Sequence, residues 1–302
     1  LHSFPTRRSS DLGDNQHERF PQTRMGVEQV IVDAFTRAQD YEKQPPDKRR
    51  DLELDALVEI LHHQRFITCH SYVQSEITML MRVAEQFGFR VNTFTHILEG
   101  YKVADKMKAH GAGASTFSDW WAYKMEVVDA IPYNATILDK MGITTAINSD
   151  DAEMGRRLNQ ESAKSVKYGN LTEEEALKLC TLYPARLLHV DKWVGSIRVG
   201  KDADLVLWND DPLSIYARVE KTLVDGTVYY DRIRDSLMQV RNEQERGRII
   251  QEMLQAKAQG EKTQPIRLFP RFEEHDEADM DLDVSDAPYR EAVSNYDQFI
   301  QY

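Results

Sequence analysis

The fold is decided by the stretch QRFITCHSYVQSEITMLMRVAEQFG, residues 64–88, which joins a strand pattern to a helix pattern. Residues 64–70 predict a strand, in which the apolar, β-branched run of residues 66–68 is followed by a cysteine and a histidine. Residues 74–88 carry apolar side chains at helical spacing and end at Gly88, which we expect to cap the helix. The stretch therefore predicts the strand and helix of a parallel βαβ unit.

The same order of strand, helix and glycine returns along the chain. Residues 90–96, 112–117 and 143–150 predict three further strands, and the helices between them end at Gly111 and Gly142. Strands that alternate with helices favour parallel, right-handed βαβ units covered by helices. Four such units in succession make half of a (β/α)₈ barrel.

The alternation of strand and helix patterns ends after the fourth predicted strand. Thr172 followed by Glu175 is a capping box that predicts a helix start. Further on, Asp225-Gly226 joins two alternating apolar runs, which is typical of a tight hairpin. We expect a charged helix and then an acidic, disordered tail at the C-terminal end. The expected parts are a partial barrel, a small β domain and this polar region, over residues 13–190, 191–231 and 232–302.

Composition limits the classes of partner. The formal charge of −12 argues against nucleic acid, because a phosphate backbone is bound by clustered Lys and Arg. No apolar run approaches the ~20 residues of a membrane helix. With only Cys69 and Cys180, the chain has neither a disulfide framework nor a cysteine-rich zinc site. A small-molecule substrate remains, and the cellular compartment stays open.

The first twelve residues, LHSFPTRRSSDL, stand apart from the rest. They contain Arg and Ser but lack the apolar core of a secretory signal. A transit peptide is one interpretation. The alternative that we favour is the translation of a sequencing-library adapter, in which case the natural protein starts near Gly13 and a segment upstream is missing.

Three polar residues follow the predicted strands at matching places. His70, His96 and Asp150 each lie at the carboxyl end of a strand, and in a barrel these ends converge on the face where active sites are built. Two imidazoles and a carboxylate are a plausible ligand set for a divalent metal such as zinc. Alternatively, each is a strand-terminal cap, a solvated loop residue or a core histidine. Their matching positions favour a shared site.

At this point the sequence resembles a known family. The segments CHSY, THILEGY and NSDD follow the strands, and VGSIRVGKDADLVLW with VDGTVYYD come later. Over residues 13–231 these are similar to the C-terminal half of a metal-dependent amidohydrolase of the imidazolonepropionase-like group. The resemblance implies an α/β fold, the C-terminal half of a (β/α)₈ TIM barrel with part of a small β-sandwich domain. It also implies that water activated by a metal hydrolyses an amide, cyclic imide or dipeptide bond.

The resemblance implies roles for individual residues. His70 matches the metal histidine of strand five, and His96 matches that of strand six. Asp150 matches the strand-eight aspartate, a metal ligand that also shuttles the proton to the leaving nitrogen. Asp151 reads as the N-terminal cap of the next helix, since it directly precedes AEMGRRL.

Four further residues are expected to contact substrate, although each also has a structural interpretation. Arg24 lies in a stretch expected to be the loop after strand four, and it is otherwise a surface arginine. Tyr101 belongs to THILEGY, while Trp120 and Trp121 lie in the strand-seven loop. Aromatic side chains of this kind more often pack than line a pocket.

The chain also departs from the family pattern. No His-x-His pair occurs in the sequence, and His62-His63 are adjacent residues that cannot replace it. The strand-four ligand is absent too. We therefore expect the chain as given to be inactive and, with open sheet edges, to pair with itself or aggregate. A non-catalytic binding homologue and a deaminase or phosphoesterase remain as alternatives; Glu76 lies too far into a helix to favour deamination.

Overall fold

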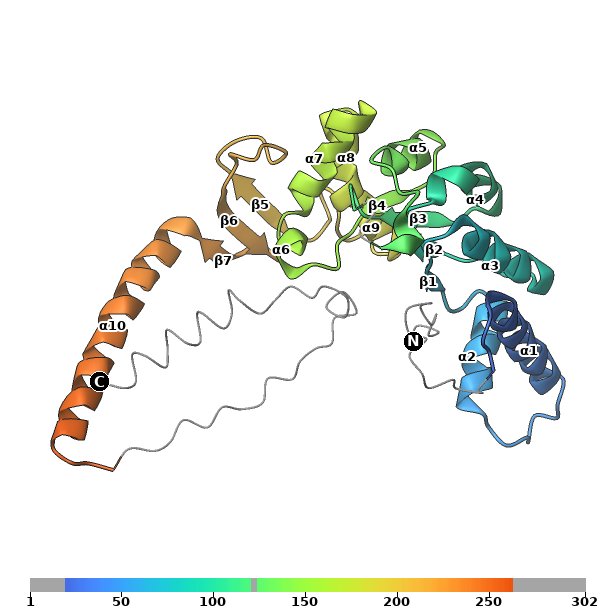
Figure 1. The fold of residues 1–302 in the computed structure, drawn as a ribbon, viewed down its shortest axis with the longest axis horizontal. Coiled ribbons are helices and arrows are strands. Elements are labelled where there is room, and N and C mark those ends of the chain that lie inside the picture. Colours follow the sequence, from blue (N-terminus) through green and yellow to red (C-terminus); the bar gives the residue numbers. More distant parts are fainter. Residues whose placement is uncertain (1–19, 121–123, 263–302) are drawn as a thin grey trace.

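The computed structural model describes residues 20–120 and 124–262. They form a four-stranded parallel sheet and a separate three-stranded antiparallel sheet, with helices packed around the first and one long helix leaving the second (Figure 1). The predictions for residues 1–12 and for the acidic tail lie outside the described residues.

The parallel sheet has the order β1-β2-β3-β4, so neighbours in the chain are neighbours in space. All three pairs are parallel, which confirms the predicted βαβ units. The strands are β1 (Thr68–His70), β2 (Thr93–Thr95), β3 (Gly113–Thr116) and β4 (Thr145–Ile147).

The strands are shorter than the sequence predicted. Residues 64–67 were expected to be part of β1, but the backbone N–H groups of Gln64 and Arg65 donate to the carbonyl of Glu59 at 2.8 and 3.2 Å. These donors close the end of the preceding helix and are not available for a sheet ladder. The strand pattern of the sequence alone could not reveal this competing use of the backbone.

Each strand is followed by at least one helix. Gly88 and Gly111 adopt the left-handed conformation expected of helix C-caps, with φ of 78° and 82°. The helices before and between the strands are α1 (Arg24–Glu42), α2 (Leu52–Leu61), α3 (Gln74–Phe87), η2 (Gly100–Val103), α4 (Ala104–His110), η3 (Met125–Val127) and α5 (Asn134–Lys140). After β4 come α6 (Ala152–Gly155), α7 (Leu158–Gly169), α8 (Glu173–Cys180) and α9 (Leu182–Leu187). The capping box of Thr172 and Glu175 starts α8 as predicted.

The main core lies between the parallel sheet and its helices. Phe94 of β2 is fully buried and packs with residues of α3 and α4 such as Ile77 and Met107. Gly113 at the start of β3 is required by a close approach, because a Cβ atom there would lie 2.2 Å from Leu187 of α9. The last turn of α9 thereby reaches the beginning of the sheet.

The second sheet consists of β5 (Leu205–Trp208), β6 (Val219–Val224) and β7 (Thr227–Asp231). Asp225 and Gly226 make the predicted hairpin, with φ of 49° and 75°. From β7 the chain enters α10 (Arg232–Ala258), none of whose residues is buried and which extends away from the body (Figure 1).

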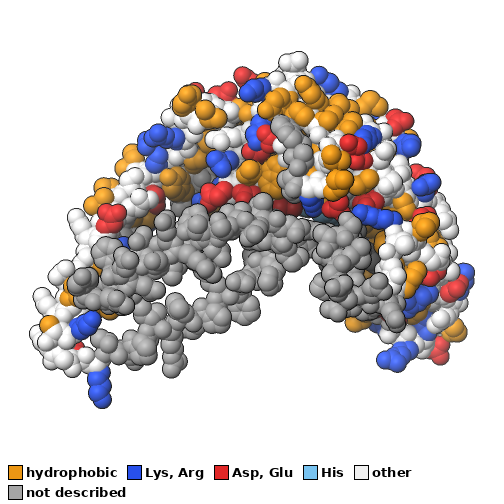
Figure 2. All heavy atoms as spheres, viewed as in Figure 1, with side chains coloured by type: hydrophobic (Ala, Val, Ile, Leu, Met, Phe, Trp, Pro, Cys, Tyr) orange, Lys and Arg blue, Asp and Glu red, His pale blue; other side chains and the backbone are white. Residues whose placement is uncertain are grey.

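The described surface is mixed in charge. On the face drawn in Figure 2, Lys and Arg side chains are interspersed with Asp and Glu side chains. Within residues 20–120 and 124–262, no helix has both the length and the apolar content needed to cross a membrane.

Candidate metal centre

His70 and His96 lie side by side at the carboxyl ends of neighbouring strands. His70 is the last residue of β1, and His96 directly follows β2, whose residue Thr95 is the register partner of His70. The Nδ1 atoms of the two rings are 2.8 Å apart, and the rings meet at 88°. Parallel pairing has therefore brought together two imidazoles that are 26 positions apart in the chain.

Asp150 reaches the same place from a loop. It lies three residues beyond the end of β4, not on the strand as the sequence indicated. Its Oδ1 atom is 3.1 Å from Nε2 of His96. His96 thus stands between His70 and Asp150, with one ring nitrogen facing each. Asp151, next in the chain, caps α6 as predicted, since its carboxylate accepts from the backbone N–H of Met154 at 2.8 Å.

The electrostatics of the cluster favour a neutral imidazole beside an ionised carboxylate. Partial burial, followed by the neighbouring charge of His96, lowers the pKa of His70 to about 4. Burial acts to raise the pKa of Asp150, but the hydrogen bond from His96 and the charges of His96, His70 and Lys124 outweigh it, so the pKa is lowered. At neutral pH this arrangement leaves His70 uncharged and Asp150 ionised.

Aromatic rings enclose the histidines. Phe117, just beyond β3 and 1% exposed, stacks on the ring of His96 at 4.8 Å, and Trp120 stacks on Phe117 at 4.5 Å. On the other side, the ring of Tyr72 meets that of His70 edge-on at 4.7 Å. The imidazoles are thus held in an apolar frame, which fixes the orientation of their rings.

The residues expected to contact substrate have other partners in the structure. Arg24 is the first residue of α1 and not part of a loop; it makes ion pairs with Glu76 in the first turn of α3 and, at 3.4 Å, with Glu126. The hydroxyl of Tyr101 donates to the carbonyl of Asp129 at 2.9 Å.

Of the two tryptophans expected to contact substrate, only Trp120 lies within the described residues. Trp120 donates from Nε1 to the sulfur of Met154 at 3.1 Å and packs in a small apolar cluster. This is the packing role that the sequence left open as an alternative. Trp121 lies outside the described residues.

Sequence reasoning missed several residues around the centre. Tyr72 and Lys124 border the histidines, and Lys124 Nζ lies 4.2 Å from the centre of the Tyr72 ring. Glu99, buried three residues after His96, fastens two of the loops. Its place in the segment THILEGY, directly behind a strand-terminal histidine, was an available signal for it.

The donor types of this cluster are ones that a divalent metal accepts. Imidazole nitrogen and carboxylate oxygen are the usual zinc ligands when thiolates are absent. In the part of the chain that the structure describes, no three His, Cys, Asp or Glu side chains already surround one point. His96 instead uses its nitrogens for hydrogen bonds to opposite neighbours, so metal binding would replace at least one of these bonds.

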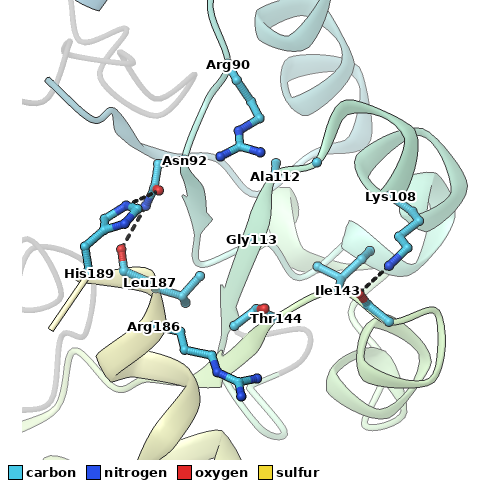
Figure 3. A pocket seen from close by; sticks show the side chains of 12 residues that line it. Arg90, Asn92, Lys108, Ala112, Gly113, Ile143, Thr144, Arg186, Leu187 and His189 are labelled. Carbon is cyan, nitrogen blue, oxygen red and sulfur yellow. Dashed lines mark hydrogen bonds between the residues drawn. The ribbon is translucent and has the colours of Figure 1, made fainter. Parts of the chain in front are cut away.

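An open cavity of about 260 Å³ lies at the other end of the strands (Figure 3). Its lining includes Asn92, Gly113 and Thr144, which stand at the beginning of β2, β3 and β4. Lys108, also in the lining, donates to the carbonyl of Gly142 at 2.7 Å beyond the end of α5. This cation stabilises a helix end, and the cavity contains none of the residues expected to bind metal.

A parallel sheet with imidazoles and a carboxylate gathered beyond the carboxyl ends of its strands is typical of barrel enzymes. Comparison with known proteins defines the class further. The model of the amidohydrolase family matches residues 51–233, more than half of the chain, and the chain belongs to this family.

Individual relatives agree with this assignment. A crystal structure of an amidohydrolase from Thermotoga maritima MSB8 superimposes with a TM-score of 0.64 and 28% identity, over 70% of this chain and 57% of that one. Amidohydrolase tasK of Hapsidospora irregularis is 28% identical over 232 residues, 70% of this chain and 24% of that protein. The urease alpha subunit of Edwardsiella ictaluri (strain 93-146) is 33% identical over 117 residues, 33% of this chain and 20% of that protein. The chain thus spans a fifth to just over half of the length of these relatives.

Proposed function

We propose that this chain carries part of the active site of a metal-dependent hydrolase of carbon–nitrogen bonds. The observation that carries the proposal is the position of His96 between His70 and Asp150, at 2.8 and 3.1 Å, beyond the carboxyl ends of the strands. Membership of the amidohydrolase family supports it. The expected substrates are small molecules with an amide, cyclic imide or dipeptide bond, in line with the resemblance of the sequence to the imidazolonepropionase-like group.

In this proposal His70 and His96 hold a divalent metal, with zinc as the first candidate. When bound, such a metal lowers the pKa of water to about 7 and polarises the scissile carbonyl. Asp150 accepts the proton from the water and delivers it to the leaving nitrogen, and its lowered pKa keeps it ionised for that purpose. The neutral state of His70 at pH 7 leaves its ring nitrogen available as a ligand.

We propose further that the chain by itself is inactive. The candidate centre has two histidines and one aspartate, and the sequence contains no His-x-His pair. Metal affinity falls steeply when ligands are missing. Deamination is less well supported than amide hydrolysis, because the carboxylate of Glu76 is engaged in an ion pair with Arg24.

The test is zinc uptake by the full chain, measured by competition with a chromogenic chelator. We expect weak binding that is lost in His70→Ala and in His96→Ala and is unchanged in His62→Ala, which removes an exposed histidine paired with Glu42. Equal zinc binding by His96→Ala would overturn the proposed ligands. Hydrolysis of an amide substrate by the unaltered chain would refute its inactivity.

A further inference from the structure

We propose that Glu99 is a positioning residue that holds the loops of His70 and His96 against each other. The proposal rests on the proposed function where it concerns metal affinity. Glu99 is only 6% exposed and follows His96 by three residues. It is one of two carboxylates that are buried within residues 20–120 and 124–262, the other being Glu161.

The side chain of Glu99 caps a helix that belongs to the neighbouring strand. Its Oε2 atom accepts from the backbone N–H of Gln74, the first residue of α3, at 3.0 Å. Val73 occupies the N-cap position of α3, and its side chain has no oxygen that could cap the helix. The first turn of a helix presents free N–H groups and a partial positive charge, both of which a carboxylate satisfies.

The main chain of Glu99 binds the same loop a second time. Its N–H donates to the carbonyl of Tyr72 at 3.1 Å. The loop after β1 therefore runs from His70 through Tyr72 to Gln74 with two of its backbone groups bound to one residue of the loop after β2. Both bonds act within four positions of His70, so they restrict where its imidazole can lie.

The backbone of His96 needs such support. Its φ of 60° lies in the left-handed region, which a residue with a Cβ atom adopts only when the surroundings hold it there. On the side of β3, the N–H of Ile97 donates to the carbonyl of Ser115 at 3.2 Å. On the side of β1, the hydrogen bonds of Glu99 to Tyr72 and Gln74 restrain the same turn. The strained turn at His96 is thus fastened to both neighbouring strands.

Glu99 is also linked, through Lys102, to the loop that follows β3. Lys102 pairs with Glu99 at 3.3 Å and with Asp129 at 2.5 Å. One ammonium thus joins the carboxylate of Glu99 to a carboxylate of the loop after β3. A residue that only stabilised α3 would need none of these links to the loops of the other strands.

The experiment compares Glu99→Ala and Glu99→Gln with Glu175→Ala. Glu175 is a matched control, because its carboxylate also caps a helix, accepting from the N–H of Thr172 at 2.7 Å, but in the capping box of α8. The measurements on the metal-free chain are the imidazole NMR signals of His70 and His96 and the hydrogen exchange rates of the Gln74 and Glu99 amides. Zinc affinity is then measured by chelator competition.

We expect Glu99→Ala to shift both imidazole signals and to speed exchange of the amides at positions 74 and 99. It should also weaken zinc binding by roughly tenfold to a hundredfold. Glu99→Gln keeps an acceptor oxygen and should restore most of the signals and the slow exchange at Gln74. Glu175→Ala should lower thermal stability and leave all of these quantities unchanged. If Glu99→Ala does not fold, Glu99→Asp replaces it, because it keeps the charge but shortens the reach to Gln74.

Unchanged imidazole signals and exchange rates in both Glu99→Ala and Glu99→Asp would overturn the proposal. The same holds if Glu175→Ala perturbs the histidines as strongly as Glu99→Ala does. If the unaltered chain takes up no zinc while Glu99→Ala still displaces both histidines, the positioning role stands and the proposed metal function fails. Zinc binding that is lost in His96→Ala but equal in Glu99→Ala supports the function and refutes the role of Glu99.

Discussion

His96 illustrates how tightly single residues are constrained around the centre. Its ring has His70 on one nitrogen, Asp150 on the other and the face of Phe117 against its plane. A left-handed backbone conformation of this kind costs on the order of 1–3 kcal/mol and persists where the surroundings fix it, often at functional sites. Packing and hydrogen bonding therefore serve the orientation of this ring as well as the stability of the fold.

Phe117 should be among the most sensitive positions of the molecule. Because it is fully enclosed between His96 and Trp120, Phe117→Ala should lower the free energy of unfolding by about 3–5 kcal/mol, and Phe117→Leu by less. Urea denaturation followed by circular dichroism measures both. Met125→Ala, at a side chain that is 84% exposed, is the control and should change stability by less than about 0.5 kcal/mol. Equal effects at the two positions would contradict the role of Phe117 in the core.

The candidate site could be predicted from the sequence only in part. The rule that parallel strands end on one face was sufficient to bring His70, His96 and Asp150 together. The rule does not specify which ring nitrogen faces which neighbour, nor does it predict the strained backbone of His96. Those features depend on Phe117, Glu99 and other residues that meet only in the folded chain.

At the scale of elements, basic side chains bind the carbonyl groups at the ends of α5 and α7. Lys108 of α4 donates to the carbonyl of Gly142 beyond α5 at 2.7 Å. A dashed line from Lys108 in Figure 3 marks this bond. Lys140 of α5 donates to the carbonyl of Gly169 at the end of α7, at 3.0 Å. Cations at these places satisfy free carbonyls and oppose the negative end of the helix dipole. Each helix thereby stabilises the next unit.

Lys108→Met and Lys140→Met should each lower the free energy of unfolding by about 0.3–1 kcal/mol, and the double variant by close to the sum. Chemical denaturation measures all three. Lys106→Met is the matched control on α4: the Lys106 ammonium has no hydrogen bond or ion pair to the residues that the structure describes, so stability should not change. A loss in Lys106→Met as large as that in Lys108→Met would argue against helix capping.

The sequence was most informative where a structural signal is local. The cap glycines Gly88 and Gly111, the capping box of α8 and the Asp225-Gly226 hairpin all appear as predicted, because each depends on residues within one or two turns. Strand lengths were wrong because pairing depends on a distant partner. The backbone N–H groups of Gln64 and Arg65 bind the end of α2 and do not extend β1.

At the scale of the whole molecule, the parallel sheet of the described residues ends in β1 on one side and in β4 on the other. β1 and β4 each have one neighbouring strand in this sheet, and Thr68 on β1 is exposed. Such edges offer free backbone groups for pairing with another chain. The long helix α10 also exposes apolar side chains, including Leu237 and Leu254 at 68% and 47%. Either surface could mediate self-association.

We expect the chain to associate with itself through the sheet edge. Sedimentation velocity over a range of concentrations should show species larger than a monomer, and Thr68→Lys should reduce them, because a lysine on an edge strand opposes pairing. A chain that ends after Arg234 tests the other surface and should associate as before. Loss of the larger species in the shortened chain, with Thr68→Lys unchanged, would assign association to α10 instead.

The measurement that tests the metal centre most directly is X-ray absorption at the zinc edge on the zinc-loaded chain. Two imidazoles and oxygen ligands at about 2.0–2.1 Å, lost together in a His70→Ala, His96→Ala double variant, are the expected result. Zinc–sulfur scattering at about 2.3 Å, which would place the metal on Cys69 or Cys180, would contradict it. A spectrum that is unchanged in the double variant would contradict it equally.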